Sequence, residues 1–217
     1  NVFLFLIRQL RGLDQPNDAL FRRYYYILES LAGVKTLSTS TELTDFSEIL
    51  CQLLKCLFAA LKPQHPAKIQ NLMLELLTPL FQETENLGSE ILDVLFDHLV
   101  EPQKSQNREG YNLAVELIER CDLLYGTNVQ HYFNQTLIGE KADSSTNQGK
   151  IYDVLFELYH INQSLMSPVL AQLEMKLLCD NEKERAASVK LLAKLFSEPQ
   201  STLAESQHQL WNAFLGR

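Results

Sequence analysis

The stretch of sequence that decides the fold runs from Leu155 to Phe196 and reads LFELYHINQSLMSPVLAQLEMKLLCDNEKERAASVKLLAKLF. Its apolar residues recur at spacings of three and four, pause at Asp180 and Asn181, and resume through Phe196. This spacing is typical of helices with one buried face, because an α-helix completes a turn in about 3.6 residues. The stretch therefore predicts two amphipathic helices joined by a tight polar turn.

The polar turn contains the signals that start the second helix. Asp180 is predicted to cap this helix by offering its carboxylate to the exposed amides of the first turn, where Glu182 is favoured by the helix dipole. Arg185 follows five residues after Asp180. An aspartate in the turn and an arginine on the next helix form a pattern that is often seen in arrays of HEAT-type hairpins, provided that the hairpin repeats.

The composition favours an all-helical protein. Of the 217 residues 46% are apolar, and the chain has only 8 Gly and 7 Pro. This apolar content is enough for a packed core, and a sheet-rich protein would need turn residues at closer intervals. The apolar opening NVFLFLI stops at Arg8, far short of the roughly 20 residues that cross a bilayer. It therefore predicts a helix face rather than a membrane segment.

The helical pattern repeats along the whole chain at a spacing of roughly 40 residues, the period of two-helix HEAT or armadillo units. The helices that open successive hairpins are predicted to begin near residues 45, 88, 128, 164 and 201. Thr127 is predicted to cap the third of these helices. Because the pattern repeats but the residues do not, we predict an all-α solenoid of divergent HEAT-type hairpins with about 11 helices.

The repeats are predicted to form one array over residues 1–217. The chain lacks an initiating Met and begins at once with a helical pattern, so we expect this array to be a fragment of a longer protein. A polar insert at 141–149 interrupts the pattern. It is predicted to be a loop because it has few apolar side chains to anchor it.

The sequence contains no recognisable catalytic or metal-binding motif. The five histidines are scattered, and none forms an HExxH motif or pairs with cysteine at zinc-ligand spacing. P-loop, GxGxxG and GxSxG motifs do not occur. Carboxylate pairs such as Glu83 with Glu85 belong to helix ends or solvated faces. We therefore predict a protein that is not an enzyme, with no catalytic residue, no metal site and no cofactor.

Charge and cysteine usage restrict the partners and the compartment. The formal net charge is −8, and no basic run is long enough to follow a phosphate backbone, so direct nucleic-acid binding is not expected. The four cysteines lie inside apolar helical patterns without a CxxC pair. Reduced core thiols are the favoured interpretation, which points to the nucleus or the cytosol.

Several segments together resemble one known family. In chain order they are YYYILESLAGVK from Tyr24 to Lys35, YFNQTL from Tyr132 to Leu137, SPVLAQLEMKL and NEKERAASVKLLAKLF within the opening stretch, and the C-terminal LWNAFLGR. They resemble the N-terminal part of the cohesin-associated HEAT-repeat regulators called "precocious dissociation of sisters". Gly33 stands where the family has tryptophan, and residues 141–149 match no part of it.

The resemblance implies a non-enzymatic regulatory subunit of cohesin, located in the nucleus and associated with chromatin, with no membrane contact. The partners that it implies are the cohesin kleisin subunit, the wings-apart-like release factor and sororin-type antagonists, bound through short peptide motifs. The alternative is a general HEAT-repeat adaptor, such as a transport or phosphatase scaffold, because such proteins share the periodicity.

The resemblance also suggests that the first helices carry part of a peptide groove. The candidate residues are Tyr24, Tyr26, Glu29, Lys35 and Glu83. An incoming arginine would need a carboxylate, because a charged and directional hydrogen bond is the strong kind. The alternative interpretation is that these are ordinary surface residues and that the consecutive tyrosines are core aromatics with hydrated hydroxyls.

Overall fold

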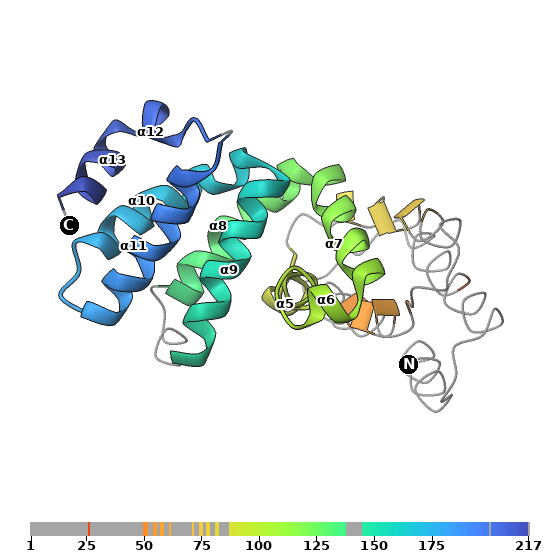
Figure 1. The fold of residues 1–217 in the computed structure, drawn as a ribbon. Helices are drawn as coiled ribbons and strands as arrows, with labels where there is room; N and C mark the ends of the chain where they lie inside the picture. Colours follow the sequence, from red (N-terminus) through yellow and green to blue (C-terminus); the bar gives the residue numbers. More distant parts are fainter. Residues whose placement is uncertain are drawn as a thin grey trace, which may run out of the picture. The chain divides into compact units, whose positions relative to one another are not determined.

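The computed structural model describes residues 87–137, 145–199 and 201–216 without a break. Before residue 87 it describes fifteen residues: Tyr26, Leu50, Cys51, Leu54, Lys55, Leu57, Phe58, Leu61, Asn71, Leu74, Glu75, Leu77, Thr78, Phe81 and Gln82. These parts of the chain consist of helices and the turns between them, and they contain no strand (Figure 1). The predicted all-α class is confirmed.

Residues 87–137, 145–199 and 201–216 contain nine α-helices and one short 3-10 helix. The first part has α5 at Ser89–Asp97, α6 at Gln103–Gln106, α7 at Arg108–Arg120 and α8 at Asp122–Leu137. They are followed by α9 at Ser145–Ile161, η2 at Gln163–Met166, α10 at Ser167–Leu177, α11 at Glu182–Ser197, α12 at Leu203–Ser206 and α13 at His208–Leu215. This count of nine differs from the 11 predicted for the whole chain.

Two pairs of consecutive helices, α6 with α7 and α12 with α13, are each separated by a single non-helical residue. Asn107 separates α6 from α7 with φ −133° and ψ 76°, and Gln207 separates α12 from α13 with φ −123° and ψ 60°. Both residues have left the helical region of the backbone map. Apolar periodicity continues across a single non-helical residue of this kind, so the pattern alone does not show the break.

The chain forms two compact units, residues 1–124 and 125–217. In the first unit the helical segment that contains Cys51 and Phe58 packs on α5 and the turn that follows it. The Cys51 thiol donates to the Glu90 carbonyl oxygen at 3.6 Å, across a separation of 39 residues. The Phe58 ring stacks on the His98 imidazole, with 4.1 Å between centroids. Two helices one predicted repeat apart are therefore in direct contact.

The second unit shows the same arrangement between α9 and α11. The Tyr152 hydroxyl and the Ser188 hydroxyl lie 2.9 Å apart, 36 residues from each other in the chain. Further along both helices, His160 Nε2 lies 3.6 Å from Glu198 Oε1. The two helices therefore run side by side in the same direction, and Figure 1 shows α9 and α11 next to each other. These contacts confirm the predicted spacing of roughly 40 residues.

Apolar side chains fill the space between the helices of each unit. In the first unit the fully buried residues include Leu50, Leu54, Leu57, Phe58, Leu77, Phe81, Ile91, Leu95, Phe96, Leu113, Leu117 and Ile118. In the second unit they include Val129, Phe133, Leu155, Leu158, Met166, Val169, Leu173, Leu177, Leu192 and Leu195. Most of these positions follow the predicted periodicity.

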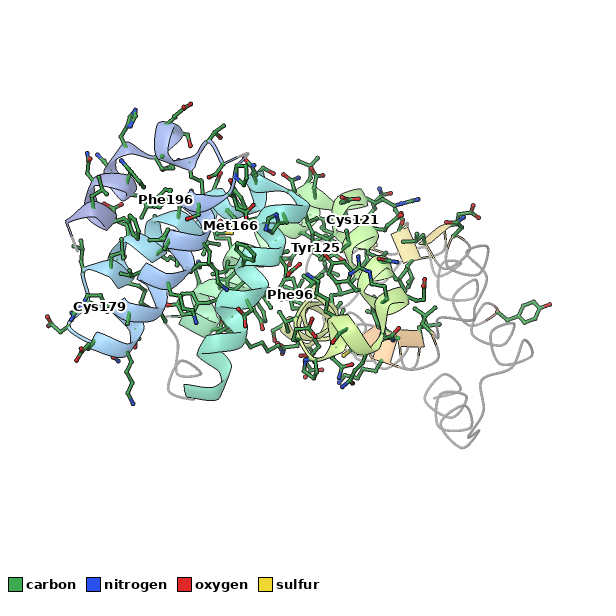
Figure 2. The ribbon with its side chains drawn as sticks, viewed as in Figure 1. Phe96, Cys121, Tyr125, Met166, Cys179 and Phe196 are labelled. Atoms are coloured by element: carbon green, nitrogen blue, oxygen red, sulfur yellow. The ribbon has the colours of Figure 1, made fainter. Side chains whose placement is uncertain are left out.

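An aromatic cluster joins α11 to α13 in the second unit. The Phe196 ring meets the Trp211 ring at 4.7 Å and the Phe214 ring at 5.2 Å between centroids. Figure 2 shows Phe196 in this position between the two helices. Aromatic pairs at such distances contribute more than their buried area alone, so the segment after Pro199 is anchored on the preceding hairpin.

Asn181 caps α11, so the prediction that Asp180 does so is wrong. The Asn181 side-chain oxygen accepts from the amides of Lys183 at 3.1 Å and Glu184 at 3.4 Å, and its Nδ2 donates to Glu184 Oε1 at 3.0 Å. Asn181 has the extended backbone of an N-cap residue, and the helix begins at Glu182. Arg185 donates to the Cys179 carbonyl oxygen at 3.1 Å, so it ties α11 to the turn backbone.

Two further predictions of helix starts are corrected. Thr127 does not cap a helix, because α8 is continuous from Asp122 and Thr127 is an exposed residue inside it. The loop predicted at 141–149 is wrong for its second part, because α9 begins at Ser145 and residues 145–149 are helical. Residues 141–144 lie outside the described residues. Once its apolar face is docked, a helix extends over polar residues at low cost.

Asn107 connects three parts of the first unit. Its Oδ1 accepts from the Gly110 amide at 3.0 Å and so caps α7, while its Nδ2 donates to the Phe58 carbonyl oxygen at 3.0 Å. Gly110 lies so close that a Cβ atom there would be 2.9 Å from Asn107 Nδ2 and 3.2 Å from His98 Nδ1. Burial lowers the pKa of His98, although the charge of Asp97 opposes the effect, so a neutral imidazole is favoured in this contact.

The cap of α11 gives a direct test of the turn. We predict that Asn181→Ala lowers the free energy of unfolding by about 1 kcal/mol, because two amides of the first turn lose their acceptor. Asp180→Ala should change it by less than about 0.5 kcal/mol, as an exposed turn residue outside the cap. Urea denaturation of both variants measures the difference. A larger loss for Asp180→Ala than for Asn181→Ala would contradict the assignment.

Two of the helical glycines, Gly110 and Gly126, are predicted to respond in opposite directions. Gly126→Ala in α8 should raise the free energy of unfolding by about 0.5–1 kcal/mol, because a Cβ there meets nothing within 4 Å and alanine favours the helix. Gly110→Ala should lower it, because the new methyl group displaces the hydrogen-bonded Asn107 side chain. Thermal unfolding of both variants gives the two signs, and a stabilised Gly110→Ala protein would contradict the close packing.

Candidate functional site

Tyr26 is the one member of the predicted peptide groove that lies among the described residues. It is helical, and its side chain is 62% exposed. At least one of the three consecutive tyrosines therefore reaches the surface. Tyr24, Glu29, Lys35 and Glu83 lie outside the described residues, so their assignment to a groove stays a prediction.

A groove of about 670 Å³ lies in the second unit, where α9 and α11 end. It is called the α9–α11 groove below, and its lining residues are Tyr159, His160, Ile161, Asn162, Gln163, Glu198 and Pro199. No residue of this groove was among the predicted site residues.

Local backbone chemistry places both helix ends at the groove. Helix α9 ends at Ile161 because the backbone of Asn162 is extended. The Asn162 side-chain oxygen accepts a hydrogen bond from the Ser164 amide at 3.0 Å, and this bond caps the start of η2. Helix α11 ends at Ser197 because the backbone of Glu198 is extended. Glu198 precedes Pro199, and a proline disfavours a helical conformation for the residue before it. The carbonyl ends of two helices therefore lie close to the same groove, and each carries a partial negative charge.

The groove contains one contact between a histidine and a carboxylate, and one of its lining residues has a buried hydroxyl. The side chains of His160 and Glu198, whose closest atoms are 3.6 Å apart, are 43% and 31% exposed. Tyr159 is 3% exposed, and its hydroxyl has no hydrogen-bond partner among the described residues. A buried hydroxyl of this kind is uncommon in folded proteins.

The position of His160 is fixed by aromatic contacts. Its ring meets the Phe156 ring at 4.6 Å and the Tyr159 ring at 6.0 Å, both edge to face. The Lys194 ammonium lies 5.3 Å from the centroid of the same Phe156 ring, at a distance where a cation is attracted to the ring face. Lys194, which lies one turn before Glu198 on α11, therefore contacts the Phe156 ring beside the groove.

A buried polar pair holds α9 and α11 together below the groove. Burial raises the pKa of Tyr152, although its hydrogen bond with Ser188 opposes the effect, so the hydroxyl stays neutral. Nearby, the Lys176 ammonium pairs with the Glu184 carboxylate and joins α10 to α11. These groups have partners within the fold, and they hold α9, α10 and α11 together.

The described parts of the chain show no arrangement typical of metal binding or membrane insertion. They contain no group of three His, Cys, Asp or Glu residues that could hold a metal ion, and none of their helices is long and apolar enough to span a bilayer. Burial raises the pKa of the Cys51 and Cys121 thiols, which disfavours the reactive thiolate. The described cysteines form no disulfide, and Cys179 lies half-buried at the α10–α11 turn (Figure 2).

The sequence could not identify the α9–α11 groove because its two halves are far apart in the chain. His160 and Glu198 lie at the ends of different helices, and each alone resembles a surface residue. The spacing between successive repeats is the sequence signal that could have placed His160 beside Glu198. With a spacing of 36 residues between Tyr152 and Ser188, the end of α9 falls beside the end of α11.

The fold defines a class of protein, the helical-repeat proteins, in which helices about one repeat apart pack on each other. Comparison with known proteins then gives the family. A family model described as "Sister chromatid cohesion protein PDS5 protein" matches residues 1–217. The chain therefore belongs to the PDS5 family of sister chromatid cohesion proteins, as the resemblance in its sequence predicted.

Individual relatives are similar over the whole chain. The chain is 39% identical over 216 residues to the PDS5 homolog A of Danio rerio and 36% identical over 217 residues to that of Homo sapiens. It is 36% identical over 217 residues to the PDS5 homolog B of Gallus gallus. All of this chain is covered in each comparison, whereas it spans only 15–16% of the length of these relatives.

Proposed function

We propose that this chain is part of a non-enzymatic regulator of sister chromatid cohesion that binds peptide motifs of partner proteins. The observation that carries the proposal is the family match over residues 1–217. The stacked hairpins support it, because a helical array presents a long surface whose parts are held in order by contacts between neighbouring repeats. A scaffold of this kind acts by holding partners close together and needs no catalytic group.

The partners in this proposal are the cohesin kleisin subunit, the wings-apart-like release factor and sororin-type antagonists, and the place of action is chromatin in the nucleus. Short peptide segments of these proteins would bind along the helical surface, with a few side chains setting the specificity. The first helices would hold one such peptide through Tyr24, Tyr26, Glu29, Lys35 and Glu83. The exposure of Tyr26 supports this assignment.

The alternative of a transport or phosphatase adaptor has weaker support. Such proteins share the helical hairpins and the spacing of roughly 40 residues. The family match and the relatives, all named as sister chromatid cohesion proteins, instead favour a role in cohesion.

Purification of the full-length native protein tests the proposal. We predict that the kleisin and other cohesin subunits copurify with it from dividing cells and remain bound through a wash at physiological ionic strength. Mass spectrometry of the recovered complex identifies the subunits, and a parallel purification of an unrelated helical-repeat protein provides the control. Recovery of the protein with transport or phosphatase components and without cohesin would contradict the proposal.

A further inference from the structure

We infer that Ser105 on α6 is a phosphorylation site for a protein kinase that recognises serine followed by glutamine, and that the phosphate binds the Arg108 guanidinium. The inference goes beyond the proposed cohesion role, because it concerns a covalent modification of the first unit. In the reaction the Ser105 hydroxyl oxygen bonds to the γ-phosphorus of ATP, and the bond from that phosphorus to the β-phosphate oxygen breaks. ADP leaves, and the hydroxyl proton passes to a base of the kinase.

The segment that contains Ser105 is accessible to another protein. Helix α6 has four residues and none of them is buried, and both Ser105 and Gln106 are exposed. A kinase draws the chain around its target serine into an extended form, and a short helix without buried side chains opens at low cost. The Gln106 carboxamide has both donors and an acceptor, so a kinase can recognise it through directional hydrogen bonds.

Ser105 lies among charged side chains that already contact one another or a shared ring. Its hydroxyl donates to the Glu101 carboxylate. The Lys104 ammonium lies 4.8 Å and the Arg108 guanidinium carbon 4.7 Å from the centroid of the Tyr111 ring, at distances where a cation is attracted to the ring. Two cations, one on each side of Ser105 in the sequence, are therefore held on one aromatic side chain.

A phosphate on Ser105 changes which of these contacts is favoured. It carries a charge of about −1.5 to −2 at neutral pH, so the Glu101 carboxylate repels it and the nearby cations attract it. Arg108 lies three residues further on, which is at most about 11 Å along even an extended chain, and the two long side chains bridge this distance. A guanidinium donates two parallel N–H bonds to phosphate oxygens. Arg108 therefore leaves the Tyr111 ring and binds the phosphate.

A second Ser–Gln pair in the chain lacks these cations. The sequence contains two such pairs, Ser105–Gln106 and Ser206–Gln207. Ser206 is also exposed and also belongs to a four-residue helix, α12. However, it follows Glu205, and no lysine or arginine lies within three residues of it. The contacts on α6 and α7 therefore favour Ser105 as the serine whose phosphate rearranges neighbouring side chains.

The first experiment asks whether the folded chain is a substrate. The complete 217-residue chain with Ser206→Ala, in which Ser105–Gln106 is the single Ser–Gln pair, is incubated with a purified Ser–Gln-directed kinase, magnesium and ATP. Mass spectrometry should locate phosphate on Ser105. Gln106→Asn should slow its incorporation by at least about tenfold, because a shorter side chain misplaces the carboxamide. Gln103→Asn, on the same exposed helix, is the matched control and should leave the rate unchanged.

The second experiment tests the contact with Arg108. Phosphoserine is incorporated at position 105, and phosphorus NMR follows its second ionisation, which ordinarily has a pKa of about 6. A guanidinium favours the doubly charged phosphate and lowers this pKa, so Arg108→Gln should raise the pKa by about 0.5. Arg120→Gln provides the control, because Arg120 is an exposed arginine of the same helix that pairs with Glu116. It should leave the pKa unchanged.

Each experiment has results that would overturn the inference. In the first they are the absence of phosphate from Ser105, or equal rates for Gln106→Asn and Gln103→Asn. In the second they are an unchanged pKa in Arg108→Gln, or equal changes in Arg108→Gln and Arg120→Gln. No cohesin component takes part in either experiment, so their failure leaves the proposed cohesion role standing, and failure of copurification leaves the modification site standing.

Discussion

The structure depends on one type of contact, in which a helix packs on the helix that lies about 40 residues further along the chain. Phe58 stacks on His98 in the first unit, and Tyr152 meets Ser188 in the second. A single amphipathic hairpin cannot bury its apolar face alone, so each hairpin is stable because the next one covers it. The fold, the cores and the groove all follow from this stacking.

Polar pairs between stacked helices define how far one helix is shifted along the other, because apolar packing alone specifies this position only loosely. Leucine-rich faces tolerate small shifts, whereas the buried Tyr152–Ser188 hydrogen bond loses both partners if α9 slides along α11. The same alignment brings His160 to Glu198 at the ends of the two helices. The α9–α11 groove is thus a consequence of the offset between repeats, and a change in that offset would remove it.

Periodicity in the sequence was sufficient to predict the all-α class, the hairpins and their spacing, because burial of one helix face dominates the energetics. It was insufficient for helix ends. Asp180 and Asn181 are both good capping residues, and the backbone geometry at Asn181 decides between them. Gly126 and Thr127 resemble a break and a new start, yet Tyr125 and Val129 are fully buried on either side, and this packing overrides the weak local preference.

The candidate sites were less accessible to sequence reasoning than the fold. A groove between helix ends depends on which residues are neighbours in space, and His160 and Glu198 become neighbours only through the stacking of α9 on α11. The family, by contrast, could be recognised from segments such as SPVLAQLEMKL, because a family resemblance depends on residue identity and not on the three-dimensional arrangement.

A double-mutant cycle at Tyr152 and Ser188 tests the stacking most directly. Tyr152→Phe, Ser188→Ala and the combined variant are compared by urea denaturation. If the two hydroxyls meet across α9 and α11, the effects on the free energy of unfolding are non-additive, with a coupling of about 1 kcal/mol. Additive effects, with a coupling near zero, would show that the helices do not pack at this offset and would contradict the account.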